Sequence, residues 1–252
     1  MVVCFFIYNF LIDTVASYQL YSCTPPLKRG FKRLIACNTN RGKSMKTHQI
    51  RHSATGETLF EGVFKTIRET VERAVGENTR LDHADLSGAN LVNAALDGAR
   101  MCHACFNGAN LMGANLSEAT LDGADFTAAS LQAVCLRFST LRGCNFDGAA
   151  FGATDIYGCD IGGSHFSTPA AFLLNFADAI NMKDCYYSIS GHEACLMSRP
   201  PVFIQGLREP VVLMDDCMLI GSVLHPRAGV SSGTNDNRPA AKLDINSERL
   251  YK

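Results

Sequence analysis

The sequence predicts an all-β protein built around a solenoid, in which the chain winds around an axis and each coil packs on the previous one. A large apolar residue recurs at every fifth position, in an unbroken register of 18 residues from Leu81 to Phe166. A small residue stands two positions before each large one, and it is Ala at every step from Ala84 to Ala129. The other three positions hold mostly Asp, Asn, Ser, Thr, Gly, Arg or His.

A period of five excludes the two common regular structures. An α-helix would turn residues five apart by about 140° and spread the large residues around its surface. A flat strand needs strict alternation with a period of two. Short extended sides joined by corners satisfy the pattern, because positions two apart face inward while the spacers face water. Glycines such as Gly88 and Gly123 stand at the expected corners and tolerate the backbone angles of a bend.

The repeated units include 84-ADLSG-88 and 109-ANLMG-113. They resemble the units of the pentapeptide-repeat family, and the resemblance covers residues 79–168. It implies a right-handed quadrilateral β-helix with four units in each coil, so that residues 20 apart stack. One face of the structural core is then expected to contain Leu86, Phe106, Phe126, Phe146 and Phe166.

Residues 45–78 are expected to form an N-terminal cap made of a hairpin and a helix. Two short strands are predicted at 48–54 and 57–63. Thr66 and Glu69 fit a capping box at the start of the helix, with the Glu69 side chain reaching back to Thr66. The apolar stripe of this helix contains Ile67, Val71, Ala74 and Val75. A cap over the first coil is the preferred interpretation, and a partner-binding helix is the alternative.

Residues 1–44 are of another kind. Their apolar run, 2-VVCFFIYNFLI-12, is shorter than the roughly 20 residues that span a bilayer, and it has no basic segment before it. The preferred interpretation is that the chain starts at Met45, so that residues 1–44 are a disordered leader or a mis-called start. A signal anchor is the alternative.

The chain after the repeats divides into two parts. Residues 169–226 are expected to form a strand-rich C-terminal cap, because 202–223 contains three apolar strand-like runs separated by turn signals such as Asp215-Asp216. This part resembles, more weakly, the tail of some phage and prophage pentapeptide proteins. Residues 227–252 are polar and predict a flexible tail.

The chain has eleven cysteines, but nothing in the sequence argues for secretion, so a cytoplasmic protein is expected. Cys144 and Cys159 take the small inward position. The stretch 102-CHAC-105 has a spacing that could suit zinc or redox chemistry, yet it is expected to be two outward spacers. His83 and His103 are 20 apart and should stack at one corner. No arrangement predicts catalysis, a cofactor or a metal.

The sequence therefore predicts a non-catalytic protein-binding or structural solenoid with an unknown partner. A homodimer is one form that it could take; direct binding to nucleic acid or to a membrane is not expected. The alternative comes from the resemblance, because some family members mimic DNA and bind DNA gyrase. The candidate edge for such binding is Asp82, Asp85, Asp122 and Asp125. Over residues 79–168, nine acids and four arginines give a net charge of −5, far below the charge density of duplex DNA.

Overall fold

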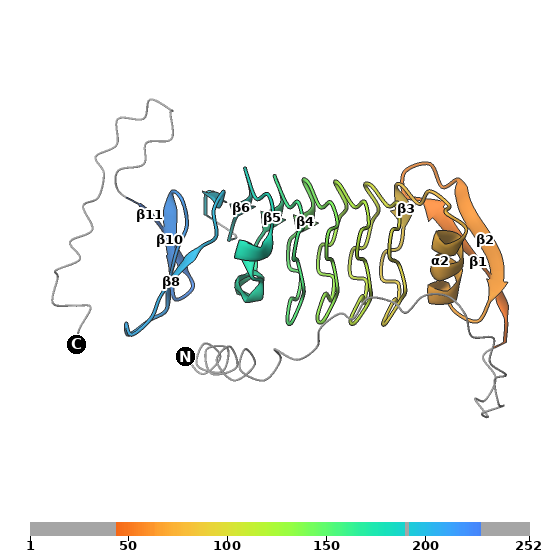
Figure 1. The fold of residues 1–252 in the computed structure, drawn as a ribbon, viewed down its shortest axis with the longest axis horizontal. Helices are drawn as coiled ribbons and strands as arrows, with labels where there is room; N and C mark the ends of the chain where they lie inside the picture. Colours follow the sequence, from red (N-terminus) through yellow and green to blue (C-terminus); the bar gives the residue numbers. More distant parts are fainter. Residues whose placement is uncertain (1–43, 190–191, 228–252) are drawn as a thin grey trace.

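The computed structural model describes residues 44–189 and 192–227. The predictions for residues 1–43 and 228–252 lie outside these described residues. Figure 1 shows a stack of coils with a hairpin and a helix at one end and an antiparallel sheet at the other. Within the described ranges, no helix is long and apolar enough to cross a membrane.

Four parallel ladders join the coils, which confirms that residues 20 apart stack. One ladder joins Asp85 to Cys105, and the other three begin at Asn90, Ala95 and Arg100. Two ladder segments are long enough to be strands, β4 (Asn145–Phe146) and β5 (His165–Phe166), and they pair in parallel. The chain is therefore a β-solenoid whose coil has four sides. Its right-handed sense stays an expectation from the family resemblance.

The large position of every repeat faces the interior. All 18 of these side chains, from Leu81 to Phe166, are at most 5% exposed. Burial of a side chain of this size contributes about 1.5–3 kcal/mol relative to leaving it in water. The face expected to hold Leu86, Phe106, Phe126, Phe146 and Phe166 is buried throughout. A single apolar core thus runs along the whole solenoid.

The corners lie two residues after each large residue and have left-handed backbone. Each of the 17 corners from His83 to Gly163 has a φ between +51° and +72°. Glycine occupies nine of them, in agreement with the predicted role of glycine. The other eight are His83, Asn93, His103, Glu118, Ala128, Ala133, Phe138 and Ala153. A side chain in this conformation costs about 1–2 kcal/mol, which the stacked ladders must offset at these corners.

A hairpin precedes the first coil. Its strands are β1 (Lys46–His52) and β2 (Thr58–Phe64), which pair antiparallel. The strands predicted at 48–54 and 57–63 are therefore displaced by two residues and one residue. β1 also pairs with β3 (Ala84–Asp85), so the hairpin extends the wall of the solenoid.

The helix α2 (Ile67–Gly76) follows the hairpin, and its N-terminus differs slightly from a full capping box. Thr66 Oγ1 accepts a hydrogen bond from Glu69 N at 3.2 Å, as predicted. The Glu69 carboxylate, however, accepts from Lys65 N at 3.1 Å, one residue before the Thr66 N of a full capping box. On the predicted stripe, Val71 and Ala74 are fully buried.

Two polar side chains of α2 complete the backbone of the first coil. Arg68 donates a hydrogen bond to the Val92 carbonyl at 3.1 Å, and the Glu72 carboxylate accepts from Ala95 N at 3.1 Å. These backbone groups have no earlier coil to bond with, and buried backbone groups left unpaired are costly. The helix thus packs Val71 and Ala74 into the apolar core and gives hydrogen-bond partners to the backbone at the end of the first coil.

Coil stacking continues past Phe166, where the sequence register fades. Two 3₁₀ helices, η1 (Pro169–Leu173) and η2 (Phe176–Asp178), replace regular repeats. β6 (Tyr186–Tyr187) then pairs in parallel with β5, 21 residues after it instead of 20. β7 (Cys195–Leu196) pairs antiparallel with β6 and ends the ladder.

A four-stranded antiparallel sheet closes the described chain. Its order is β11-β10-β9-β8, and its strands are β8 (Val202–Ile204), β9 (Val211–Leu213), β10 (Cys217–Ile220) and β11 (Val223–Pro226). Asp215 and Asp216 lie in the turn between β9 and β10, as the sequence predicts. The last of the three predicted runs is divided into two strands at Gly221, which has a φ of +60°.

Candidate functional site

The four acidic residues of the predicted edge fall in two adjacent columns. Asp85 and Asp125 belong to one ladder, with Cys105 between them. In the other column, Asp82 accepts a hydrogen bond from Cys102 N at 2.9 Å. One coil of uncharged side chains therefore separates the two acidic pairs, and the edge is not a continuous acidic stripe.

These carboxylates also have partners inside the protein. Asp125 Oδ1 accepts from Thr127 N at 3.0 Å, and Asp122 Oδ1 accepts from Arg142 N at 3.0 Å. Asp82 forms an ion pair with Arg80 at 2.9 Å. The side chains therefore hold the solenoid backbone in place, and part of their charge is neutralised locally.

Near the same edge, the exposed guanidinium of Arg142 pairs with the buried carboxylate of Asp160. Arg142 Nε lies 2.7 Å from Asp160 Oδ2. Burial acts to raise the pKa of Asp160, but hydrogen bonds from Arg142, Gly162 N and Asn181 lower it below its ordinary value. The carboxylate is therefore held as the anion, and it completes the coil wall.

An exposed group of aromatic rings and a guanidinium lies on another part of the solenoid; we call it the aromatic cluster, and it consists of Arg137, Phe138 and Tyr157. Phe138 is 55% exposed and Tyr157 48%. The two rings meet edge to face at 5.6 Å, and the Arg137 guanidinium lies 5.0 Å from the centre of the Tyr157 ring. Asp155 Oδ2 lies 3.8 Å from Arg137 Nη1, and this ion pair orients the guanidinium.

The sequence contains a signal for this cluster, because Phe138 is an apolar exception in the repeat, but the repeat alone assigns it no role. Phe138 is a large apolar residue at an outward corner, where the repeat otherwise places glycine or a small or polar residue. Gly158 stacks on it, and a Cβ at Gly158 would lie 2.5 Å from the Phe138 ring. The missing side chain therefore leaves the space in which the ring lies.

Three imidazoles stack at one corner of the first coils. The predicted contact between His83 and His103 is present, with ring centroids 5.0 Å apart. His52 from β1 adds a third ring at 4.8 Å from His83, which the repeat register could not predict because His52 precedes the repeats. The stack joins the hairpin to the solenoid.

The two cysteines of 102-CHAC-105 are half-buried outward spacers, as expected. Cys105 Sγ lies 3.1 Å from Ser87 Oγ. Within the described residues, the group of three side chains that could hold a metal lies elsewhere, at Cys195, Asp216 and Cys217.

The inward cysteines are part of the core. Cys144 Sγ donates to the Leu121 carbonyl at 3.1 Å, and Cys159 Sγ donates to the Leu136 carbonyl at 2.8 Å. Burial raises the pKa of both thiols, and it raises the pKa of Cys185 to about 11. These thiols are therefore held protonated and replace the alanine of other repeats.

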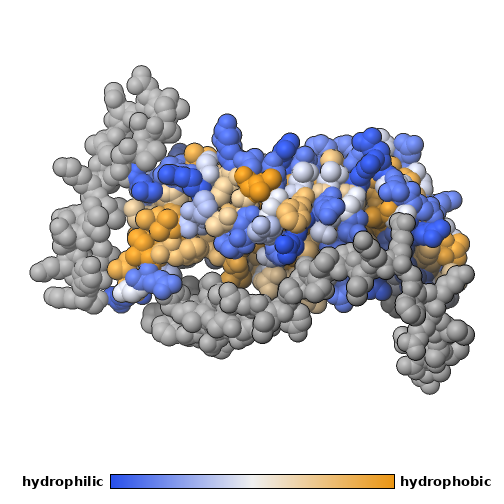
Figure 2. Space-filling model, viewed as in Figure 1, coloured by the Kyte–Doolittle hydropathy of each residue, from blue (hydrophilic) through white to orange (hydrophobic). Residues whose placement is uncertain are grey.

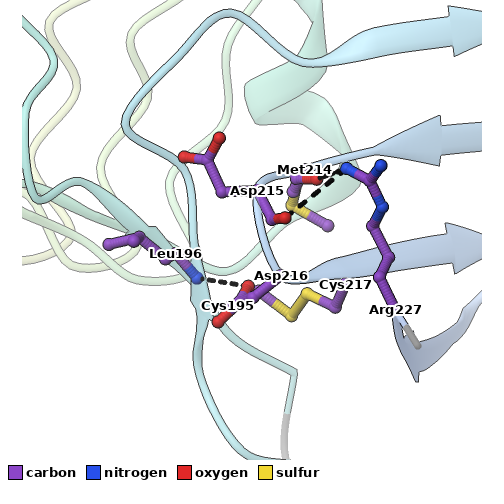
Figure 3. Close-up of a disulfide and its surroundings, with 7 residues drawn as sticks. All are labelled: Cys195, Leu196, Met214, Asp215, Asp216, Cys217 and Arg227. Atoms are coloured by element: carbon purple, nitrogen blue, oxygen red, sulfur yellow. Dashed lines mark hydrogen bonds between the residues drawn. A yellow bond between two sulfur atoms is a disulfide. The ribbon is translucent and has the colours of Figure 1, made fainter. Parts of the chain in front are cut away.

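A disulfide joins the end of the solenoid to the C-terminal sheet (Figure 3). It links Cys195 in β7 to Cys217 in β10, and both residues are buried. Next to it, Asp216 Oδ1 accepts from Leu196 N at 2.8 Å, and Arg227 donates to the Met214 carbonyl at 2.6 Å. The sequence analysis missed this bridge, because the two cysteines are 22 positions apart and belong to no repeated spacing.

The surface around these features is mixed in character. Figure 2 shows hydrophilic residues over much of the rod, and apolar residues gathered toward the end that holds the C-terminal sheet. At that end, the edge strand β8 exposes all three of its residues, Val202, Phe203 and Ile204.

Comparison with known proteins agrees with the repeat structure. The family model described as pentapeptide repeats matches residues 77–108, 109–148 and 129–167, with eight copies. No curated protein matches the chain.

Several solved structures are similar. A pentapeptide repeat protein from Nostoc PCC 7120 is 30% identical over 35% of this chain and 66% of its own, with a TM-score of 0.29. One from the thylakoid lumen of Arabidopsis thaliana is 25% identical over 47% of this chain and 87% of its own, with a TM-score of 0.23. QnrB1, a plasmid-mediated fluoroquinolone resistance protein, is 26% identical over 33% of this chain and 44% of its own, with a TM-score of 0.30.

All three TM-scores are below 0.5, so the assignment depends on the repeats themselves and not on a likeness of whole structures. The eight matched copies coincide with the four-sided coils and their buried large residues. Through residues 77–167, the chain belongs to the pentapeptide-repeat family.

Proposed function

We propose that the protein is a non-catalytic binding module that recognises a protein partner through the aromatic cluster on its solenoid. In this proposal, residues 45–78 and 169–226 are caps that keep the coil ends from water, and residues 79–168 present the binding surface. The solenoid is proposed to be right-handed, as in its family, and the protein to be cytoplasmic.

The rigidity of the solenoid supports a binding role. Outward side chains are fixed by hydrogen bonds to the backbone of their own or a neighbouring coil, as Asp125 is by Thr127 N and Asp122 by Arg142 N. A surface that is already ordered loses little conformational entropy when a partner binds. Repeat proteins present extended surfaces of this kind.

The aromatic cluster is the observation that carries the proposal. Tyr and Arg are enriched among the residues that dominate binding energy at protein interfaces. Phe138 is held in a left-handed corner with φ +59°, where most corners have glycine or alanine, and its ring has no role in the core. The left-handed backbone at Phe138 costs free energy, and its exposed ring recovers little of that cost by burial within the chain. This supports a role for the ring in contact with a partner.

The test is a capture experiment with purified full-length protein as bait and soluble cell extract as prey. Phe138→Ala is the informative variant, because Ala128, Ala133 and Ala153 already occupy corners with the same backbone. Met112→Ala is the matched control, since Met112 is also an outward apolar residue, 45% exposed. We expect a captured protein to be lost with Phe138→Ala and with Tyr157→Ala, and to be retained with Met112→Ala.

Binding that survives in the Phe138→Ala and Tyr157→Ala variants contradicts the proposal. The alternative, a DNA mimic that binds gyrase, is tested in parallel with purified gyrase and a variant in which Asp82, Asp85, Asp122 and Asp125 are changed to Asn. Loss of gyrase binding in that variant alone would favour the alternative. The structure supports it less, because uncharged Cys102 and Cys105 interrupt the edge and Arg80 forms an ion pair with Asp82.

A further inference from the structure

We propose that Cys195, Asp216 and Cys217 form a zinc site that opens when the disulfide between the two cysteines is reduced. Their ligand atoms, two sulfurs and one carboxylate oxygen, all lie within 4.8 Å of one another. Two thiolates with a carboxylate or an imidazole are a ligand set that zinc prefers, because soft sulfur donors select this metal over calcium and magnesium.

The backbone holds these three side chains in place from two elements (Figure 3). Asp216 Oδ1 accepts a hydrogen bond from Leu196 N at 2.8 Å, which leaves its second carboxylate oxygen for a metal. Met214 N donates to the Cys217 carbonyl at 2.9 Å and closes the turn that holds Asp216. Arg227 N donates to the Asp216 carbonyl at 2.8 Å. Asp216 and the turn beside Cys217 are therefore held by hydrogen bonds in addition to the bond between the sulfurs.

A cavity beside the sulfurs offers room and a fourth ligand. Its volume is about 220 Å³, and its lining includes His192, Glu193 and His225 in addition to the three proposed ligands. Structural zinc takes four ligands in a tetrahedron, and imidazole is a common one. His192 is exposed and His225 is half-buried, so a cation can reach the cavity from solvent. One of these two imidazoles is the proposed fourth ligand.

The two states of the site exclude each other chemically. A dithiol reductant gives two electrons and two protons to the Cys195–Cys217 bond, which breaks to two thiols while the reductant becomes a disulfide. Zinc then displaces the two thiol protons and forms two metal–sulfur bonds. In the oxidised state neither sulfur is a thiolate, so the site does not bind zinc.

Either state links the solenoid to the C-terminal sheet. The disulfide joins β7 to β10 in an oxidising compartment, where such bonds persist. Zinc joins the same two strands where thiols are kept reduced. The junction therefore suits the cytoplasmic location expected from the sequence as well as an oxidising one.

The experiment uses Co²⁺, which takes zinc sites and reports thiolate ligands by a charge-transfer absorption band. The full-length chain has Cys4, Cys23, Cys37, Cys102 and Cys105 changed to Ser, which removes the thiols outside the described residues and the half-buried pair. Reduced protein is expected to bind one Co²⁺ per chain with a thiolate band, and added Zn²⁺ is expected to remove that band. The same protein with its disulfide intact is expected to show no band.

Variants of the proposed ligands show whether a loss of Co²⁺ binding comes from a missing ligand or from an unfolded protein. Cys217→Ser is expected to abolish the band, and Asp216→Asn, which keeps both sulfurs, is expected to weaken Co²⁺ binding by at least about tenfold. Thermal unfolding followed by circular dichroism shows whether each variant is folded. Either His192→Ala or His225→Ala is expected to weaken binding similarly, and unchanged binding in both would overturn the proposed imidazole ligand. If reduced parent and folded Asp216→Asn bind Co²⁺ equally, or oxidised protein binds as well as reduced, the zinc site itself is wrong.

Discussion

The rings of Phe106 and Phe126 lie parallel, with their centroids 5.0 Å apart and 1° between their planes. The two residues are 20 apart in sequence and occupy the same position in successive coils. Phe146 continues the stack at 5.1 Å from Phe126. Phe126 therefore has a ring against each of its faces.

Replacing Phe126 is expected to destabilise the solenoid strongly. Phe126→Ala leaves a cavity between two stacked rings and should lower the free energy of unfolding by about 3–5 kcal/mol. Phe126→Asp should cost more, because it also buries a carboxylate without a partner. Urea denaturation followed by circular dichroism measures both, and exposed Met112→Ala, expected to change stability by less than about 0.5 kcal/mol, is the control. A Phe126→Asp midpoint equal to that of the parent would show that the stack is not part of the core.

Two glycine corners with different surroundings separate backbone strain from contact with the aromatic cluster. Gly88 and Gly158 have φ values of +63° and +72°, so alanine at either should cost about 1–2 kcal/mol. A Cβ at Gly88 meets nothing within 4 Å, whereas one at Gly158 would lie 2.5 Å from the Phe138 ring. We therefore expect Gly158→Ala alone to displace that ring and weaken partner binding. Equal loss of partner binding in both variants would contradict the assignment of Phe138 to the binding surface.

The fold could be predicted to the extent that it depends on a repeated local rule. The position of each large residue and the stacking of residues 20 apart follow from the register, because every coil meets the same packing requirement. The coil beyond Phe166 could not be predicted in this way. There, η1 and η2 replace two regular sides, and one extra residue shifts the pairing of β6 with β5.

The candidate sites depend on residues and contacts that do not follow the five-residue repeat. Phe138 differs from other corner residues in size, and the sequence shows this once corners are compared with one another. The Cys195–Cys217 pair has no such signal, because it forms only when β10 folds back on β7. Long-range pairing of this kind is decided by the packing of the two sheets and leaves no periodic mark on the sequence.

The disulfide is expected to stabilise the C-terminal sheet against unfolding. Closing a loop between residues 22 apart contributes roughly 3 kcal/mol by its effect on the unfolded chain. Treatment with a dithiol and a chelator, which keeps metal away, should therefore lower the unfolding midpoint of the oxidised parent. The Cys217→Ser variant should already have the lower midpoint, and the dithiol should not change it further. A dithiol effect of equal size in both would assign the stabilisation to another thiol pair.

The ion pair of Asp160 with Arg142 predicts a specific acid dependence. Although burial acts to raise the pKa of Asp160, its hydrogen bonds with Arg142, Gly162 N and Asn181 lower it in the folded protein. The folded state therefore holds the proton less tightly than the unfolded state does. The resulting stability is fully present above the unfolded pKa, about 3.9 for Asp, and is lost as the pH falls through the lower folded value.

The measurement is the difference in free energy of unfolding between the parent and Asp160→Asn at several pH values. We expect the difference to be largest near neutral pH and to shrink below about pH 4, where the parent loses the charge that the variant never had. Asp97→Asn, at an exposed position, is the control and should show no such pH-dependent difference. A difference that stays constant down to the lowest pH would mean that Asp160 stabilises the coil through its shape and neutral hydrogen bonds, and not through its negative charge.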